Sequence, residues 1–204
     1  LYDAMRVCAG RLPGGVAVQT TLVAIVMAAM TGIIGGEIVL LGLLALPQML
    51  RLGYDQKLAI GTICAGGSLG TMIPPSVVLI VYGLTAGVSI GDLFLGGVFP
   101  GLMLASFYVT YIIVRATLNP ALAPPLPEEE LNMPFGEKVR LLKGLILPFC
   151  IIIWVLGSIY GGIASVTEAA GVGAVAALLA AAVRGELNLG LITDSLQRTM
   201  TTVG

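Results

Sequence analysis

The sequence predicts an all-α integral membrane protein with several membrane-crossing helices. Of its 204 residues, 57% are hydrophobic and only 10% are charged, whereas soluble domains carry about 25% charged residues. The mean hydropathy of the chain is +1.03. The apolar residues also fall in long runs, 16–34, 94–114, 141–160 and 163–183. Each run is close to the about 20 residues that a helix needs to cross a bilayer core of ~30 Å.

The composition also excludes several function classes. The net charge is −1, so there is no basic excess for binding nucleic acid. Histidine is absent, which removes the commonest general base and metal ligand. Glu37, Glu168 and Ser68 are therefore left without a partner for acid–base or nucleophilic catalysis. The three cysteines are odd in number and lack metal-binding spacing. We expect neither an enzyme nor a cofactor.

Residues 14–50 predict a helical hairpin, because two apolar arms flank a glycine-rich tip at 31–37. Glu37 lies in this tip, in an apolar setting where an ionisable group is costly and usually faces a cavity or a partner. A bare carboxylate there could coordinate a cation or carry a proton. Alternatively, the tip reaches the water interface and Glu37 is simply hydrated.

Residues 57–88 predict a broken transmembrane helix. A half helix leads into a glycine-rich stretch at 66–71, then into Pro74 and Pro75, and a second half begins at Ser76. Pro75 cannot donate a backbone N–H, and consecutive prolines push the residues before them out of the helical region. The alternative is a proline kink whose glycines serve close helix packing.

The break is the strongest functional signal in the chain, because non-helical backbone at membrane depth is tolerated only against protein or a water-filled cavity. Carbonyls freed at the end of one half helix suit sodium, and the positive start of the other suits a carboxylate. The candidate ligands of a sodium ion are Gly66, Gly67, Ser68, Gly70 and Thr71, with Gly35, Gly36 and Glu37 of the hairpin tip. The candidate contacts of a substrate carboxylate at the break are Pro74, Pro75 and Ser76.

The rest of the chain predicts a span at 94–116, a polar linker at 117–140, and two further spans at 141–160 and 163–183. Thr167 and Glu168 open the last span. They are weaker substrate candidates, because a cap by the hydroxyl of Ser165 or Thr167 and an acidic first turn are also ordinary features of a helix start.

The positive-inside rule supports this tracing. If the hairpin returns to its starting side, the broken segment crosses and each later span crosses once, every basic residue falls on one face. That face is then cytoplasmic. These residues are Arg6, Arg11, Arg51, Lys57, Arg115, Lys138, Arg140, Lys143, Arg184 and Arg198.

Several motifs make the chain resemble the large membrane subunit of tripartite ATP-independent periplasmic (TRAP) transporters, the DctM-like subunit. The specific element is the run of residues 65–76, Ala-Gly-Gly-Ser-Leu-Gly-Thr-Met-Ile-Pro-Pro-Ser. Supporting motifs are Leu12-Pro13-Gly14-Gly15, Gly53-Tyr54-Asp55, Val88-Ser89-Ile90-Gly91 before Leu93-Phe94, Pro100-Gly101, and Gly162-Ile163-Ala164 before Thr167-Glu168-Ala169-Ala170.

The resemblance implies an ion-coupled elevator transporter in a bacterial inner membrane. Two inverted repeats, each with a hairpin and a broken helix, would form a central site for substrate and sodium. The implied partners are a small membrane subunit and a soluble periplasmic substrate-binding protein, and the implied substrates are organic acids. On this basis 1–116 would be first-repeat transport elements, 117–140 a cytoplasmic linker and 141–204 the start of the second repeat. Family chains are roughly twice as long, so the second hairpin and broken helix are expected to be missing.

Two positions depart from the family pattern. Many members have small hydroxyl residues at the first hairpin tip, where this chain has Gly35-Gly36-Glu37, so backbone carbonyls or Glu37 become the expected ion ligands there. Val166 replaces a proline that often precedes the Thr-Glu-Ala-Ala motif. A passive anion channel or uniporter, or a non-transporting structural subunit, remains the alternative function.

Overall fold

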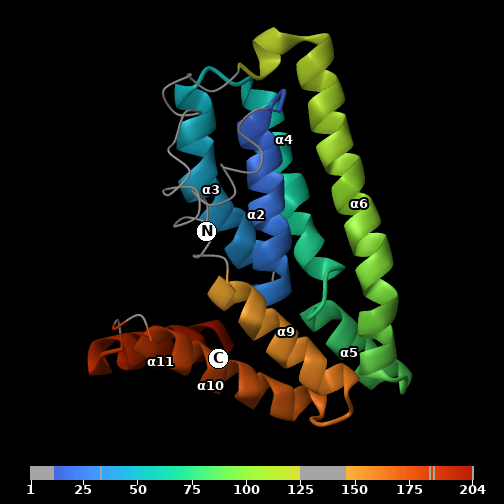
Figure 1. The fold of residues 1–204 in the computed structure, drawn as a ribbon, viewed down its shortest axis with the longest axis vertical. Helices are drawn as coiled ribbons and strands as arrows, with labels where there is room; N and C mark the ends of the chain where they lie inside the picture. The colour runs from blue at the N-terminus through green and yellow to red at the C-terminus, as the bar shows by residue number, and fades with distance from the viewer. Residues whose placement is uncertain (1–11, 33, 125–145, 184, 186, 204) are drawn as a thin grey trace. The chain divides into compact units, whose positions relative to one another are not determined.

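The computed structural model describes residues 12–32, 34–124, 146–183, 185 and 187–203, and all regular secondary structure in this part of the chain is helical (Figure 1). The prediction of an all-α chain is therefore confirmed. The chain divides into two compact units, Leu1–Ile152 and Ile153–Gly204. The candidate ion ligands all belong to the first unit.

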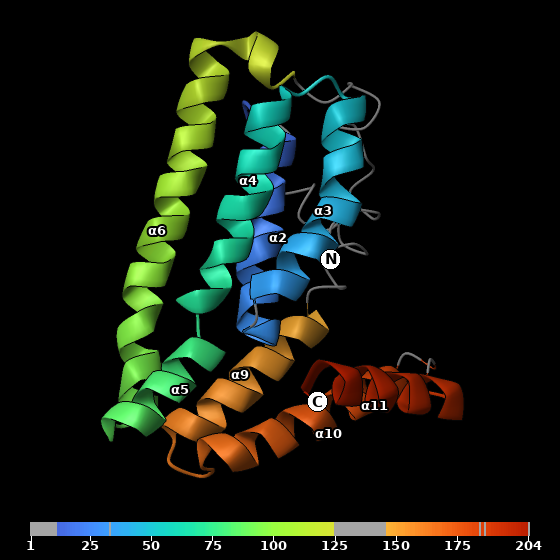
Figure 2. The ribbon, with the colours of Figure 1, turned by 180° about the vertical axis from the view of Figure 1, so that it is seen from behind.

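Helices α2 (Gly15–Thr31) and α3 (Ile34–Arg51) form an antiparallel pair (Figure 2). Helix α2 ends because Gly32 takes a left-handed conformation, with φ 62°, and its N–H donates to the carbonyl of Ala28. Glycine is favoured there because it carries no side chain to clash in that conformation.

The turn of this hairpin is shorter than the sequence predicted. Gly35, Gly36 and Glu37 lie in the first turn of α3 and not in the connection. The sequence prediction was wrong on this point because α2 already stops at Gly32, which leaves the later glycines free to continue as helix.

The next segment consists of α4 (Gln56–Ser68), a short 3-10 helix η1 (Leu69–Thr71) and α5 (Val77–Ala86). Helix α4 begins at a cap, in which a carboxylate oxygen of Asp55 accepts the N–H of Leu58 at 3.0 Å. Residues 72–76 are not helical. They contain Pro74 and Pro75, joined by a cis peptide bond. We call residues 72–76 the non-helical link.

Gly66 and Gly67 lie inside α4, not in the link as the sequence suggested. Packing explains their presence. A Cβ atom on Gly66 would lie 3.0 Å from the Cβ of Ala24, and one on Gly67 would lie 2.2 Å from Cγ1 of Ile38. Both glycines therefore let α4 approach α2 and α3 closely.

Helix α6 (Ile90–Leu118) has 29 residues, which corresponds to about 44 Å at 1.5 Å per residue. It runs alongside both α4 and α5 (Figures 1 and 2). Its start is capped by Ser89, whose hydroxyl accepts the N–H of Asp92 at 3.3 Å. Among the described residues, α6 and α10 (Val166–Val183) are long and apolar enough to cross a membrane, while α2, α5 and α9 (Ile146–Tyr160) are shorter apolar helices.

The main core of the first unit joins α2, α3, α4 and the C-terminal part of α6. Its fully buried side chains include Val16, Leu41 and Met49. A second, smaller cluster joins the end of α2 to η1, the link and the middle of α6. Its members are Ala28, Leu69, Ile73 and Ala105.

The second unit contains the end of α9 (Ile146–Tyr160), α10 and α11 (Leu189–Val203). Gly162, with φ 66°, lies in the turn between α9 and α10. Helix α11 was not predicted from the sequence. Of the predicted linker 117–140, the described part ends at Pro124 and includes the 3-10 helix η2 (Pro120–Leu122); residues 125–140 lie outside the described residues.

Candidate functional site

The turn between α2 and α3 contacts the link between η1 and α5. The N–H of Val77, the first residue of α5, donates to the carbonyl of Gly32 at 3.3 Å. A Cβ atom on Gly32 would lie only 2.3 Å from the carbonyl oxygen of Pro75. The hairpin turn therefore lies directly against the backbone of the link, at a distance that only glycine allows.

Three hydroxyl groups follow one another from the last residue of α4, through η1, to the end of the link. Ser68 donates to the carbonyl of Ala65 at 2.7 Å, Thr71 donates to that of Ser68 at 2.7 Å, and Ser76 donates to that of Thr71 at 2.8 Å. Each hydroxyl hydrogen is thus used by a backbone carbonyl. The hydroxyl oxygens keep acceptor lone pairs, which can coordinate a cation.

Not every predicted ligand is equally available. The carbonyl of Gly66 already accepts the N–H of Leu69, because the helical hydrogen-bond pattern continues through that residue. Ser76 is fully buried and adopts an extended conformation just before α5. Its hydroxyl bonds to Thr71 and does not cap the helix, and its carbonyl accepts the N–H of Ile80 at 3.1 Å.

Glu37 is the most unusual group in the described part of the chain. It is 1% exposed, and neither carboxylate oxygen has a hydrogen-bond partner among the described residues. Leu41 lies one turn further on the same face of α3, and a Cβ atom on Gly66 would lie 3.8 Å from its Cδ1 atom. Glu37 is therefore on the face of α3 that packs toward α4. A buried ionised carboxylate without a partner is strongly unfavourable, so this group is either neutral or paired with a bound cation.

Helix α6 supports the link through Gly97 and Gly101, of which the sequence analysis named only Gly101, as part of the motif Pro100-Gly101. A Cβ atom on Gly97 would lie 2.9 Å from the carbonyl oxygen of Met72, and one on Gly101 would lie 3.0 Å from Cγ1 of Ile73. The signal that could have revealed them is their spacing, because two glycines four residues apart are typical of close helix packing in membranes.

Thr167 and Glu168 lie in the second unit and are exposed. Glu168 and Ser165 form a reciprocal cap. The carboxylate of Glu168 accepts the N–H of Ser165 at 2.8 Å and its hydroxyl at 2.7 Å, while the N–H of Glu168 donates to the hydroxyl of Ser165 at 3.3 Å. The Glu168 carboxylate is therefore engaged in starting α10, whereas the hydroxyl of Thr167 is exposed.

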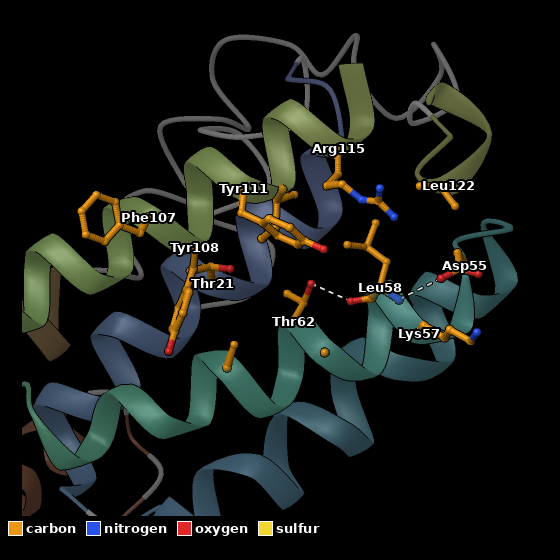
Figure 3. A pocket seen from close by; sticks show the side chains of 13 residues that line it. Thr21, Asp55, Lys57, Leu58, Thr62, Phe107, Tyr108, Tyr111, Arg115 and Leu122 are labelled. Carbon is orange, nitrogen blue, oxygen red and sulfur yellow. Dashed lines mark hydrogen bonds between the residues drawn. The ribbon is translucent and has the colours of Figure 1, made fainter. Parts of the chain in front are cut away.

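A cavity of about 520 Å³ opens between α2, α4 and α6 (Figure 3). Lys57 and Arg115 lie at one end, and Phe107 and Tyr108 at the other. The Tyr108 hydroxyl lies 3.4 Å from that of Ser68, so the inner end of the cavity adjoins the hydroxyl series. None of the site residues predicted from the sequence lines this cavity.

A match to a known protein family shows what kind of protein contains this hairpin and link. The family model described as "Tripartite ATP-independent periplasmic transporter, DctM component" matches residues 1–204. The chain belongs to the DctM family. The resemblance inferred from the link motif is thereby confirmed, and the apolar helices are those of a membrane protein.

Curated relatives of this DctM-family chain are named as large permease proteins of TRAP transporters. The C4-dicarboxylate permease protein DctM of Pseudomonas aeruginosa is 36% identical over 177 residues, covering 86% of this chain and 40% of the relative. The ectoine permease protein TeaC of Halomonas elongata is 32% identical, covering 79% of this chain and 36% of the relative. The isethionate permease protein DctMQ of Oleidesulfovibrio alaskensis is 33% identical, covering 91% and 28%.

The DctM-family chain is shorter than each of these relatives. It spans about two-fifths of the length of the first of them and less of the other two. The relatives are transporter permeases and not enzymes. Their names also differ in substrate, so family membership alone does not assign one.

Proposed function

We propose that this chain is part of the permease subunit of a sodium-coupled, binding-protein-dependent secondary transporter that imports organic acids. The observation that carries the proposal is the contact between the hairpin turn at Gly32 and the link at Pro75 and Val77. It brings together two stretches of non-helical backbone that a lone membrane helix would not tolerate.

In this proposal, α4, η1 and α5 form one discontinuous transmembrane helix. The link lies level with Gly97 on α6, 18 residues before Arg115 and so about 27 Å along the helix from it. Arg115 lies at the end of the first unit that also carries Lys57 (Figure 3). A break at that distance still falls within a hydrocarbon core of ~30 Å, near its opposite boundary, and there must face protein or a water-filled site.

Sodium is proposed to bind between the link and the start of α3. Freed carbonyls at the end of a half helix coordinate sodium in transporters built on this principle. The hydroxyl oxygens of Ser68 and Thr71 have unused lone pairs, and the buried carboxylate of Glu37 has no partner within the described residues. A bound cation would neutralise that carboxylate. The backbone carbonyls of Gly67 and Gly70 complete the proposed set, whereas Gly35 and Gly36 lie in the first turn of α3, whose free backbone groups are N–H donors.

The substrate carboxylate is proposed to bind at the start of α5, beside the backbone of Pro74, Pro75 and Ser76. The first turn of a helix presents N–H groups and a positive dipole end to an anion. In the second unit, Thr167 is the proposed substrate contact, because Glu168 is engaged in the cap of α10.

Movement of the hairpin and the discontinuous helix as one body is proposed to carry ion and substrate across a bacterial inner membrane. The proposed partners are a small membrane subunit, a soluble periplasmic binding protein that delivers the organic acid, and the lipid bilayer. The membrane potential contributes about 2.3 kcal/mol per net charge moved at 100 mV. If each transport cycle carries net positive charge inward, the potential would therefore help to drive accumulation of the substrate.

Uptake of labelled organic acids into proteoliposomes tests the proposal. The full-length permease would be reconstituted with its small subunit, with and without an inward sodium gradient and with and without the binding protein. Accumulation only when both are present supports the proposal. Equilibration that does not depend on sodium indicates a channel or uniporter, and no flux under any condition indicates a structural subunit.

A further inference from the structure

We propose that the cavity between α2, α4 and α6 binds an anionic phospholipid of the cytoplasmic leaflet, with its headgroup at Lys57 and Arg115 and an acyl chain along the inner wall. The inference does not depend on sodium coupling or on the identity of the transported substrate.

The charges of the cavity are confined to one end (Figure 3). Lys57 and Arg115 are exposed there and form no ion pair with any described residue. Asp55, the one carboxylate among the described residues that line the cavity, accepts the N–H of Leu58 as the cap of α4. Two cations against one engaged carboxylate leave the entrance positive, which favours an anionic group.

Away from this end, the walls are mainly apolar, and Ala65, Ile112 and Phe107 line this part of the cavity. The hydroxyls of Tyr108 and Tyr111 are polar groups beside these walls. The hydroxyls of Thr21 and Thr62 also face the cavity, but they donate to the carbonyls of Ala17 and Leu58 at 3.1 and 2.8 Å. A small dicarboxylate would gain little from such walls, whereas a hydrocarbon chain would bury apolar surface against them.

The dimensions fit one leaflet. Along α4 the lining runs from Asp55 to Ala65, ten residues or about 15 Å, which is half of a hydrocarbon core of ~30 Å. The cavity volume of about 520 Å³ lies within the ~300–1,000 Å³ typical of small-molecule sites.

The end of the cavity with Lys57 and Arg115 lies at the end of the first unit that is expected to face the cytoplasm, where lipid headgroups are found. Helix α4 begins and α6 ends at this end of the first unit (Figures 1 and 3), and the two ends are tied by the N–H of Asp55, which donates to the carbonyl of Leu122 at 2.9 Å. It is also the end to which the positive-inside rule assigns the cytoplasm. Basic pockets between membrane helices on that side favour acidic headgroups.

The test uses the full-length permease with its small subunit, purified and transferred to nanodiscs. The double variant Lys57→Gln/Arg115→Gln is compared with Arg51→Gln, which removes a cation from the end of α3 without lining the cavity. We expect phosphatidylglycerol to raise the melting temperature of the parent protein and of Arg51→Gln, while the double variant needs at least about tenfold more of this lipid for the same shift. A phosphatidylglycerol analogue with a photoreactive group near the end of its acyl chain should label the segment 107–112 in the parent protein.

Three results would overturn the proposal. Phosphatidylcholine could stabilise the parent protein as well as phosphatidylglycerol does, which would remove the role of headgroup charge. A soluble dicarboxylate could protect the protein through Lys57 and Arg115 while lipid does not, which would make the cavity a substrate site. Alternatively, the 107–112 segment could stay unlabelled while a Gly61→Cys variant, whose new side chain would be exposed in the cavity, is closed to thiol reagents in delipidated protein. That would mean that another part of the full-length permease fills the cavity.

Discussion

The carbonyl oxygen of Gly32 accepts the N–H of Val77 at 3.3 Å, so the residue that ends α2 also satisfies a donor at the start of α5. These two residues are 45 positions apart in the chain. Backbone groups freed by a helix break must find partners inside a membrane protein, and here the hairpin turn supplies one. The contact makes the hairpin and the discontinuous segment a single packed unit.

Gly32→Ala should disrupt this contact. The added Cβ would lie 2.3 Å from the carbonyl oxygen of Pro75, at a residue whose φ is 62°. We expect a loss of at least about 2 kcal/mol in the free energy of unfolding, because a left-handed alanine alone costs roughly 1–3 kcal/mol. Thermal unfolding in detergent measures it. Gly42→Ala in α3 is the control, since nothing lies within 4 Å of its Cβ position; equal stability of the two variants would contradict the assigned contact.

Gly97→Ala should separate α6 from the link, because the new Cβ would lie 2.9 Å from the carbonyl oxygen of Met72. Backbone cannot move aside as easily as a side chain, so we expect a lower melting temperature and slower uptake. The neighbouring change Gly96→Ala meets nothing within 4 Å and should be neutral or stabilising by up to about 1 kcal/mol, through helix propensity. If the two variants behave alike in both assays, α6 does not support the link as described.

Glu37→Gln tests whether the buried carboxylate holds a cation. The change keeps the shape of the side chain and removes the charge. We expect the sodium-free protein to be about as stable as the parent, whose Glu37 is then neutral because a buried unpaired charge is strongly unfavourable, while stabilisation by sodium disappears. Binding of a ligand at 100 times its dissociation constant contributes about 2.7 kcal/mol, which is readily detected.

The measurement for Glu37→Gln is the melting temperature in sodium chloride against potassium chloride at equal ionic strength. Glu168→Gln is the charge-matched control, because Glu168 lies in the second unit and is exposed. A sodium-dependent shift that survives in Glu37→Gln would remove Glu37 from the ion site and leave it as a neutral buried acid.

Ser68→Ala and Thr71→Ala should each weaken sodium binding about five- to tenfold in uptake assays, or about 1 to 1.4 kcal/mol, because each removes a hydroxyl oxygen from the proposed ligand set. Ser106→Ala serves as the comparison. Its hydroxyl also donates to a backbone carbonyl, that of Leu102 at 2.7 Å, but it lies on an exposed part of α6. Unchanged sodium affinity in the first two variants would discard this assignment.

Substitutions should show that Glu168 has a structural role and Thr167 a role in substrate binding. Ser165→Ala and Glu168→Gln both weaken the reciprocal cap, so each should destabilise the protein by roughly 0.5–2 kcal/mol without changing the KM for substrate. Thr167→Val removes an exposed hydroxyl that makes no cap and should raise KM. A raised KM in Glu168→Gln with normal stability would reverse the two assignments.

The sequence by itself determined the class of the protein and the position of the non-helical link at Pro74 and Pro75. Long apolar runs predict membrane helices whatever their neighbours are, and the link follows from Pro74 and Pro75, whose rings restrict the local backbone. The Ser165 and Glu168 cap is equally local, since its two residues are three positions apart. Such features depend only on residues that are close together in the chain, so a single sequence is enough to predict them.

Only the tertiary structure decided which residues meet. It assigned the hairpin turn to Gly32 and placed Gly35 and Gly36 in α3, and it showed that Gly66 and Gly67 serve packing inside α4. The burial of Glu37, the contact of α6 with the link, and the cavity ending at Lys57 and Arg115 depend on three or more helices at once. Contacts between distant residues depend on how whole helices pack, because a side chain's burial and partners come from neighbouring elements and not from its own position in the sequence.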